Sequence, residues 1–280
     1  MNSRELKKNP LAINCTEVVQ VLKGFIRTEV LKTGFSKVVL GLSGGIDSSL
    51  SAALAVEALG AENVHGVMMP YASSNPSSLG DATLLAEKLG MSCRQVEITS
   101  MVDPYFAAAD GIDNMRRGNV MARQRMIVLY DVSAEIGALV LGTSNKTEYL
   151  LGYSTLWGDS ACALNPLGDL YKTQVWELAR YLKLPEQIID KKPSADLWTG
   201  QTDEDELGFT YKEADEVLAL MIDCRMKPEH VAERGYSEKF VEQMMLMVRK
   251  TQYKRHLPLI AKLSNRTINR DFRFPRDWGL

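Results

Sequence analysis

Short apolar runs alternate along the chain with longer stretches in which apolar residues recur every three or four positions. The runs of strand length predict β-strands at 37–42, 64–69, 94–98 and 138–142. The periodic stretches predict helices at 16–31, 48–59, 81–89, 118–137, 170–182, 211–221 and 238–250. Strands separated by helices pair in parallel, and right-handed crossovers place the helices on both faces of the sheet. We therefore expect an α/β fold with a doubly wound, mainly parallel sheet.

The predicted helix at 118–137 has apolar residues on more than one of its faces. These residues are Met126, Ile127, Leu129, Tyr130 and Val132. An amphipathic helix needs only one apolar face to pack on a sheet, so a second apolar face suggests contact with a second subunit.

Four arginines gather near the start of the same helix: Arg116, Arg117, Arg123 and Arg125. Guanidinium groups bind phosphates and carboxylates through paired hydrogen bonds. The cluster could therefore receive an anionic substrate. For Arg116, Arg117 and Arg125, a solvated basic face is an equally good interpretation.

The sequence G-L-S-G-G-I-D-S-S at 41–49 joins the first predicted strand to the next helix. The first amides of a helix lack partners within it, and the helix dipole is positive at that end, so an anion is stabilised there. Adjacent glycines let the backbone approach a phosphate closely, and the serine hydroxyls add donors. The predicted phosphate loop comprises Gly41, Leu42, Ser43, Gly44, Gly45, Ile46, Asp47 and Ser48. The alternative is a glycine-capped turn that binds no ligand.

Two carboxylates are predicted to meet at this edge of the sheet. Asp47 places a negative charge where a phosphate would lie, which is favourable if a divalent cation lies between them. Residues 143–148 follow the predicted strand at 138–142, so Glu148 reaches the same edge. Because Mg²⁺ prefers carboxylate and phosphate oxygens, Asp47 and Glu148 are the predicted metal ligands.

Lys172 stands near the start of the predicted helix at 170–182, where the helix dipole disfavours a cation unless an anion is nearby. We therefore expect Lys172 to bind a phosphate, with a solvated lysine as the alternative. The turn-rich segment 70–78 is either a mobile lid or a simple surface loop. The long connection at 191–206 is typical of a functional lid or of disorder.

The chain has 280 residues, of which 45% are hydrophobic and 24% charged, and its formal net charge is −2. No repeat, low-complexity block or linker divides it, so we expect a single domain over 1–280. The small net charge gives no general attraction to nucleic acid or to a membrane. The four cysteines form no C-x-x-C pair, and no apolar run has the length of a signal core or a membrane span. These features favour the cytoplasm.

The S-G-G-x-D-S motif at 43–48 resembles the pyrophosphate loop of the N-type ATP pyrophosphatases. Further segments along nearly the whole chain are similar to one family of that superfamily, the ammonia-dependent NAD synthetases. These segments are G-N at 118–119 with Arg123, L-G-T-S-N-K-T-E at 141–148, G-D-L-Y-K-T at 168–173, P-S-A-D-L-W at 193–198, G-Q-T-D-E-D-E-L-G at 200–208 and K-R at 254–255. The resemblance implies an adenine nucleotide alpha hydrolase-like fold and a homodimer.

The resemblance also implies a reaction. The nicotinate carboxylate of deamido-NAD attacks the α-phosphate of ATP and releases pyrophosphate, and ammonia then displaces AMP from the acyl carbon to give NAD. A carboxylate is a poor electrophile, and adenylation turns its oxygen into a leaving group. The nitrogen donor would be free ammonia or ammonia from a separate partner, because the chain shows no glutamine-hydrolysing domain.

The same resemblance assigns roles to individual residues. The ATP contacts it adds to the loop are Thr143, Lys172 and Ser194. The deamido-NAD contacts it implies are Arg123, Tyr253 and Lys254. Mg²⁺ would be held by Asp47 and Glu148, and Asp47 and Lys172 would carry catalysis. Segments 70–80 and 198–208 resemble the two lids of the family.

The chain departs from the commonest family pattern at two substrate contacts. Leu156 and Ala163 stand where many members have Lys and Asp, and Tyr253 stands where His is common. The chain matches a variant pattern, G-D-x-A-C-A-x-N-P, at 158–166, which indicates a subgroup difference.

Other functions are alternatives to this one. Another ATP pyrophosphatase, acting on a related carboxylate such as nicotinate mononucleotide, is the closest of them. A tRNA-thiolating enzyme would need paired reactive cysteines and a basic surface, and a GMP synthetase would need its own dimerisation region. A non-catalytic nucleotide sensor would keep the glycine loop but would not need Glu148, Lys172 and two lids together.

Overall fold

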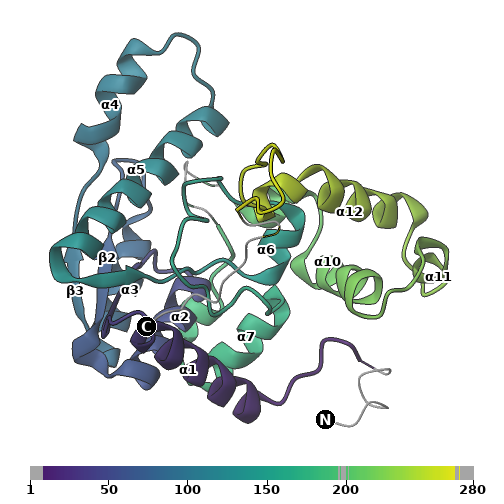
Figure 1. Ribbon diagram of the computed structural model, residues 1–280, viewed down its shortest axis with the longest axis horizontal. Coiled ribbons are helices and arrows are strands. Elements are labelled where there is room, and N and C mark those ends of the chain that lie inside the picture. The colour runs from purple at the N-terminus through teal and green to yellow at the C-terminus, as the bar shows by residue number, and fades with distance from the viewer. Residues whose placement is uncertain (1–8, 195, 197–199, 201, 269–270, 272–280) are drawn as a thin grey trace.

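The structure is a computed structural model that describes residues 9–194, 196, 200, 202–268 and 271. Four parallel strands form a sheet in the order β3–β2–β1–β4 (Figure 1). Their bounds are β1 Lys37–Gly41, β2 Val64–Met68, β3 Ser92–Gln95 and β4 Ala138–Val140. Val39 of β1 pairs with His65 on one side and with Val140 on the other, so β1 lies inside the sheet. The predicted parallel sheet is confirmed.

Helices cover both faces of this sheet, as a doubly wound fold requires (Figure 1). One face packs against α1 (Cys15–Leu31), α2 (Ile46–Leu59), α3 (Pro76–Leu89), α7 (Lys172–Tyr181) and α8 (Glu186–Ile189). The other face packs against α4 (Thr99–Ala108) and α5 (Asn114–Ile136). Successive residues of a strand point to opposite faces. Val38 and Leu40 therefore belong to the first cluster, while Val39 belongs to the second.

A third apolar cluster lies among the helices that follow the sheet in the chain. It joins α6 (Lys146–Leu151), α10 (Tyr211–Leu218), the π-helical turn η2 (Ala219–Asp223), α11 (Pro228–Ala232) and α12 (Glu238–Lys250). Figure 1 shows α10, α11 and α12 standing beside the sheet layers. We call α10, η2, α11 and α12 the C-terminal helical layer. The remaining short elements are η1 (Ala61–Asn63), α9 (Asp203–Leu207) and η3 (Gln252–Arg255).

Local capping explains why several of these helices begin and end where they do. The side chain of Asp113 accepts a hydrogen bond from the backbone N of Arg116 at 2.7 Å, which fixes the start of α5. Gly137 and Gly90 adopt left-handed conformations and end α5 and α3. The helix expected from residue 118 therefore begins four residues earlier, at Asn114.

Two predicted elements between 70 and 100 have the wrong bounds. Helix α3 begins at Pro76 and not at residue 81, because Asn75 caps it and proline suits the first helical position. The loop expected over 70–80 is therefore a loop only as far as Asn75. The strand expected at 94–98 lies at 92–95, and the buried Ile98 leads into α4, which was not predicted.

Further differences occur in the second half of the chain. The helix expected at 211–221 ends as an α-helix at Leu218 and continues as the turn η2. Within the second predicted lid, residues 203–207 form α9. The rest of that prediction falls in part on residues 198, 199 and 201, which lie outside the described residues. Residues 195 and 197 of the P-S-A-D-L-W segment also lie outside them. The helix at 238–250 is confirmed at both ends.

Within the described ranges, no helix combines the length and the apolar character that a membrane crossing requires.

Candidate active site

The predicted phosphate loop forms a tight turn between β1 and α2. Gly45 is the N-cap of α2 and Asp47 lies in its first turn. The hydroxyl of Ser43 accepts from the backbone N of Gly45 at 3.2 Å and lies 3.1 Å from the hydroxyl of Ser48. Gly44 has φ +72°, and a Cβ there would lie 2.2 Å from the carbonyl oxygen of Ser78. The turn therefore needs glycine at 44 both for its backbone conformation and for its contact with α3.

Asp47 forms an ion pair with Lys172 at this turn. The Lys172 ammonium contacts Oδ2 of Asp47, and the Nδ2 amide of Asn145 donates to Oδ1 at 2.9 Å. The lysine side chain is only 2% exposed, so the alternative of a solvated lysine is wrong. Its ammonium also lies 5.2 Å from the ring centroid of Tyr211.

Glu148 lies in the first turn of α6, where it forms a capping box with Asn145. Its Oε2 accepts from the backbone N of Asn145 at 3.0 Å, while Oδ1 of Asn145 accepts from the backbone N of Glu148 at 2.9 Å. Burial and the nearby charge of Asp47 raise the pKa of Glu148 well above its usual range, and Lys172 opposes that shift. Burial lowers the pKa of Lys172, but the charges of Asp47 and Glu148 outweigh burial and raise it. The structure thus brings Asp47, Glu148 and Lys172 together, as predicted.

A third carboxylate, Asp203 of α9, lies in the same electrostatic surroundings. Its two oxygens accept from the hydroxyls of Tyr153 at 3.1 Å and Tyr211 at 3.0 Å. Burial raises the pKa of Asp203, and the charge of Lys172 lowers it. These contacts attach the described end of the predicted second lid to the body of the protein beside Lys172.

The carboxylate oxygens of Asp47 and Glu148 are of the chemical type that Mg²⁺ prefers. Among the described residues, no group of three or more His, Cys, Asp and Glu side chains is placed to hold a metal. Mg²⁺, however, commonly takes one or two carboxylates and completes its octahedral shell with phosphate oxygens and water. The charge of Asp47 contributes to the raised pKa of Glu148, as expected for a carboxyl group with a second carboxylate nearby.

Two of the predicted deamido-NAD contacts meet around the loop that follows α6. Arg123 donates from a terminal nitrogen to the carbonyl of Leu156 at 3.2 Å. The Lys254 ammonium donates to the carbonyls of Gly152 at 2.7 Å and Ser154 at 2.5 Å. Burial lowers the pKa of Lys254; the charge of Asp159 opposes this shift, and the nearby charge of Arg123 adds to it. The side chain of Tyr253 is 61% exposed.

The other predicted ATP contacts lie at two places along the same edge. Thr143 is half-buried in the turn between β4 and α6. Ser194 is exposed, and its hydroxyl accepts from the backbone N of Asp196 at 3.0 Å. The carboxylate of Asp196 in turn accepts from the backbone N of Asn75 at 3.1 Å, which connects this segment to the start of α3.

The remaining arginines of the predicted basic cluster have different surroundings. Arg116 is exposed, as a solvated basic face requires. Arg117 stacks over the ring of Phe106 at 4.3 Å from its centroid, and Nε of Arg125 donates to the carbonyl of Met69 at 3.0 Å.

The two departures from the family pattern are accommodated by backbone contacts. The carbonyl of Leu156 is the acceptor for Arg123, and the backbone N of Ala163 donates to the carbonyl of Val140 at 2.8 Å. Leu141 and Leu164 form a parallel bridge beside that contact. The segment around Ala163 thus continues the sheet edge beyond β4.

Sequence reasoning missed three polar residues that organise this site: Asn145, Asp203 and Asp215. Asn145 and Asp203 lie inside the motifs at 141–148 and 200–208. These motifs mark both segments as parts of the site but do not indicate what either side chain does. Asp215 is completely buried in α10. Its signal is an aspartate on the apolar face of a helix, four residues after the buried Tyr211 and three before the buried Leu218.

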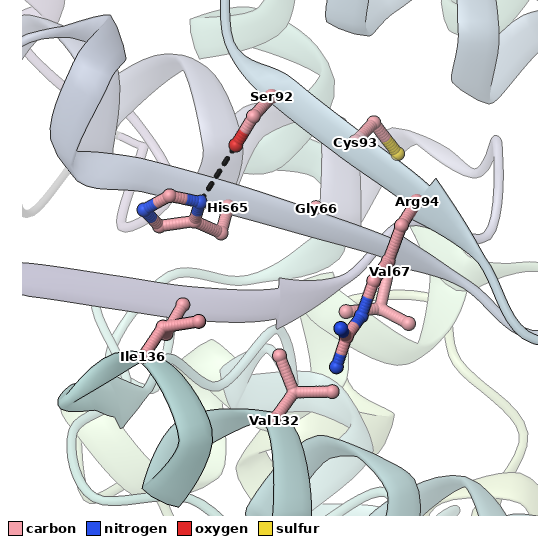
Figure 2. A pocket seen from close by; sticks show the side chains of 8 residues that line it. All are labelled: His65, Gly66, Val67, Ser92, Cys93, Arg94, Val132 and Ile136. Atoms are coloured by element: carbon pink, nitrogen blue, oxygen red, sulfur yellow. Dashed lines mark hydrogen bonds between the residues drawn. The ribbon is translucent and has the colours of Figure 1, made fainter.

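A separate pocket lies along β2 and β3, beside the C-terminal part of α5. It is lined by His65, Gly66, Val67, Ser92, Cys93, Arg94, Val132 and Ile136 (Figure 2). His65 and Ser92 stand near the amino ends of β2 and β3, and Nδ1 of His65 lies 2.6 Å from the hydroxyl of Ser92. None of the predicted site residues lines this pocket.

Comparison with known proteins gives consistent results at the levels of family and sequence. The family model described as NAD synthase matches residues 18–258. An NH(3)-dependent NAD(+) synthetase of Trichlorobacter lovleyi is 57% identical over 269 residues, covering 96% of this chain and 98% of that protein. One from Fusobacterium nucleatum is 53% identical over 255 residues, covering 91% of this chain and 99% of that protein.

Solved structures agree with these relatives. The NMN synthetase of Francisella tularensis has a TM-score of 0.79 at 32% identity and covers 89% of this chain and 99% of its own. The NH3-dependent NAD synthetase of Campylobacter jejuni, solved in complex with a nitrate ion, has a TM-score of 0.77 at 35% identity. It covers 89% of this chain and 100% of its own.

Proposed function

The chain belongs to the NAD synthase family, and from that premise we propose that it amidates deamido-NAD to NAD with ATP and ammonia. It is a ligase of NAD biosynthesis that forms a carbon–nitrogen bond. The observation that carries the proposal is the convergence of Asp47, Glu148 and Lys172 at the carboxyl end of β1 and β4. In open α/β sheets this edge carries the ligands.

The proposed reaction has two steps. An oxygen of the nicotinate carboxylate bonds to the α-phosphorus of ATP, and the bond from that phosphorus to the bridging oxygen of pyrophosphate breaks. The nitrogen of ammonia then bonds to the acyl carbon, AMP leaves with the carboxylate oxygen, and the nitrogen loses a proton. Because no side chain needs to act as nucleophile, the protein contributes positioning and charge stabilisation.

We propose that the turn at 41–48 holds the phosphates of ATP, with Lys172 as the cation that faces them. The N-terminal amides of α2 and the lysine charge would stabilise negative charge on the departing pyrophosphate. Thr143 and Ser194 are the further proposed ATP contacts. The contacts from Ser194 through Asp196 to Asn75 support this role, because Ser78 in the same first turn of α3 lies against Gly44.

Arg123, Tyr253 and Lys254 are the proposed contacts to deamido-NAD. The approach of Arg123 and Lys254 around the loop after Gly152 supports a common site for an anionic substrate. This loop follows α6 directly, so the two substrate sites would adjoin each other at α6.

Asp47 and Glu148 are the residues that would hold Mg²⁺. When bound, Mg²⁺ would neutralise phosphate charge and polarise the phosphorus–oxygen bonds. The capping box with Asn145 would orient Glu148, and the amide of Asn145 would orient Asp47.

The assembly and setting of the protein are also proposals. We propose one domain over 1–280 that forms a homodimer through α5. Its outer face exposes Met115, Ile127 and Tyr130, at 70%, 54% and 42% of their surface, while Val128 and Val132 pack on the sheet. All four cysteines are free thiols, which supports a reducing compartment such as the cytoplasm.

The decisive experiment measures conversion of ATP to AMP with and without deamido-NAD and ammonia. NAD formation that depends on both supports the proposal, and AMP release that ignores deamido-NAD contradicts it. Nicotinate mononucleotide should be tested side by side, since the similar Francisella tularensis structure is an NMN synthetase. A higher kcat/KM for the mononucleotide would show that it, and not deamido-NAD, is the preferred substrate. The proposed adenylation and amidation steps would be unchanged.

A further inference from the structure

Asp215 of α10 is a buried carboxylate that contacts neither the phosphate loop nor the deamido-NAD residues. Its side chain is 0% exposed, and it accepts hydrogen bonds from two other helices. Oδ1 accepts from the hydroxyl of Thr147 in α6 at 2.5 Å, and Oδ2 accepts from the backbone N of Thr173 in α7 at 2.7 Å. A buried carboxylate is stable only when such donors satisfy it.

The contacts continue from Asp215 to the backbone of Lys172. The hydroxyl of Thr147, while donating to Asp215, accepts from the backbone N of Lys172 at 3.0 Å. The first amides of a helix have no acceptor within that helix. In α7 the amides of Lys172 and Thr173 find their acceptors in Thr147 and Asp215. A negative charge at this end also complements the dipole of α7.

The residues held in this way are immediate neighbours of the proposed reaction groups. Thr147 precedes Glu148 in the first turn of α6, and Lys172 itself donates to the network. One carboxylate therefore fixes the starts of α6 and α7 relative to each other. A second contact, from the backbone N of Lys146 to the carbonyl of Leu170 at 2.8 Å, runs alongside it.

We propose that Asp215 is a positioning residue for the amidation reaction, setting Glu148 and Lys172 at the distance that ATP requires through Thr147 and the first amides of α7. This inference rests on the proposed roles of Glu148 and Lys172. Asp215 touches no substrate and acts only through its neighbours. The C-terminal helical layer, which supplies Asp215, thereby takes part in the function of the sheet edge.

The test uses Asp215→Asn, with Glu216→Gln as the matched control. Glu216 is the next residue of α10, and its carboxylate accepts from the hydroxyl of Tyr236 at 2.6 Å. In Asp215→Asn the side-chain NH₂ cannot accept, so the network loses one of its two bonds. We expect kcat to fall by about 10- to 100-fold, as for other residues that orient catalytic groups, with the control close to wild type.

Binding of ATP supplies a readout that is independent of turnover. Calorimetry with EDTA measures metal-free ATP binding, to which Lys172 would contribute, and calorimetry with Mg²⁺ adds the contribution of the proposed metal ligand Glu148. We expect Asp215→Asn to weaken ATP binding under both conditions, and more strongly with Mg²⁺. A role confined to stability would lower the melting temperature and leave both affinities unchanged, which would overturn the inference.

Thr147→Val and Thr147→Ser keep the test decisive if Asp215→Asn does not fold. Thr147→Val removes the bridging hydroxyl at nearly constant volume, so we expect the same loss as in Asp215→Asn. Thr147→Ser restores the hydroxyl and should recover most of that loss. Equal ATP binding and kcat in the two threonine variants would overturn the inference.

The outcomes also separate this inference from the proposed function. If the wild-type protein amidates deamido-NAD and the Asp215 and Thr147 variants do so equally well, only the positioning role fails. If the wild type ignores deamido-NAD but the variants bind ATP more weakly, the proposed function fails and the positioning role stands.

Discussion

The ammonium of Lys172 and the carboxylate of Asp47 form an ion pair that is almost closed to solvent on the lysine side. A buried charge is tolerated only while its partner remains, because its solvation by water has been lost. Lys172 and Asp47 therefore depend on each other for stability as well as for the proposed chemistry. Removal of either side chain should consequently disturb the other.

Asp47→Asn should abolish formation of AMP even at saturating Mg²⁺. The variant loses one proposed metal ligand and leaves Lys172 without its nearest counter-charge, so the free energy of unfolding should also fall by roughly 3 kcal/mol. Turnover is measured by AMP release and stability by urea denaturation. Glu57→Gln, which breaks the surface pair with Lys23, is the control and should change neither quantity appreciably. Near-normal turnover of Asp47→Asn would refute the metal role.

Lys172→Ala should weaken the use of ATP while the protein remains folded. Loss of one charge-assisted contact to a phosphate corresponds to a rise in the KM for ATP of roughly 10- to 100-fold. Steady-state kinetics with varied ATP, together with a circular dichroism spectrum, checks both parts. The exposed Lys250 at the end of α12 supplies the control Lys250→Ala. Unchanged ATP kinetics would show that Lys172 does not face a phosphate.

Glu148→Gln separates metal binding from helix capping. A glutamine can still accept from the backbone N of Asn145, so α6 should keep its start, but the carboxylate charge is gone. We expect the Mg²⁺ concentration for half-maximal activity to rise by about 10- to 100-fold. Glu213→Gln is a closely matched control, since Glu213 forms the same capping box with Thr210 at an exposed site. An unchanged Mg²⁺ requirement in Glu148→Gln would exclude Glu148 as a ligand.

Gly44→Ala should disrupt the phosphate loop. The φ of +72° is unfavourable for alanine, and the added Cβ would lie 2.2 Å from the carbonyl oxygen of Ser78. The free energy of unfolding should fall by at least about 1–3 kcal/mol, and ATP binding should be lost. In contrast, a methyl group added at Gly24 in α1 would meet nothing within 4 Å, so Gly24→Ala should be neutral or stabilising. Retention of ATP binding in Gly44→Ala would contradict the proposed loop.

Titration of Asp215 should make the free energy of unfolding depend on pH. Burial raises the pKa of this carboxyl from 3.8 to about 6, although hydrogen bonds from Thr147 and Thr173 and the charge of Lys172 oppose the shift. The folded protein therefore binds a proton more readily than the unfolded chain between these two values. The contribution of Asp215 to stability should be greatest below about pH 4 and should decline as the pH rises to about 6.

That contribution is isolated by comparison with Asp215→Asn. The difference in free energy of unfolding between wild type and variant should change by on the order of 3 kcal/mol between about pH 4 and pH 7, in the direction that favours the variant at higher pH. Urea denaturation across this range measures it. A difference that does not vary with pH would show that the carboxyl pKa is the same in both states.

The parts of the fold that could be predicted from the sequence are those in which local signals agree. At the phosphate loop an apolar run, paired glycines and a small-residue helix all predict the same turn, and the structure has it between β1 and α2. The helix at 238–250 has a serine cap and strong periodicity, and its bounds were predicted correctly. The meeting of Asp47 with Glu148 followed from the rule that parallel strands end at a common edge.

What could not be predicted depends on contacts between distant residues. Helix α4 contains Pro104 in its interior, which weighs against a helix when only the sequence is considered. The pairing of Lys172 with Asp47 joins residues 125 positions apart, and that of Thr147 with Asp215 joins residues 68 apart. The motifs identified Lys172, but its burial became evident only in the folded chain.

The amide of Thr173 donates to Asp215, which lies in α10, and this contact limits how far the protein can be shortened. A fragment ending before α10 would retain all four strands and the glycine turn, yet the hydroxyl of Thr147 and the amide of Thr173 would both lose Asp215. The proposed nucleotide site therefore depends on a residue in the last quarter of the chain, and the two cannot be separated in a shortened protein. Any minimal version must carry α10 or supply a substitute carboxylate at that position.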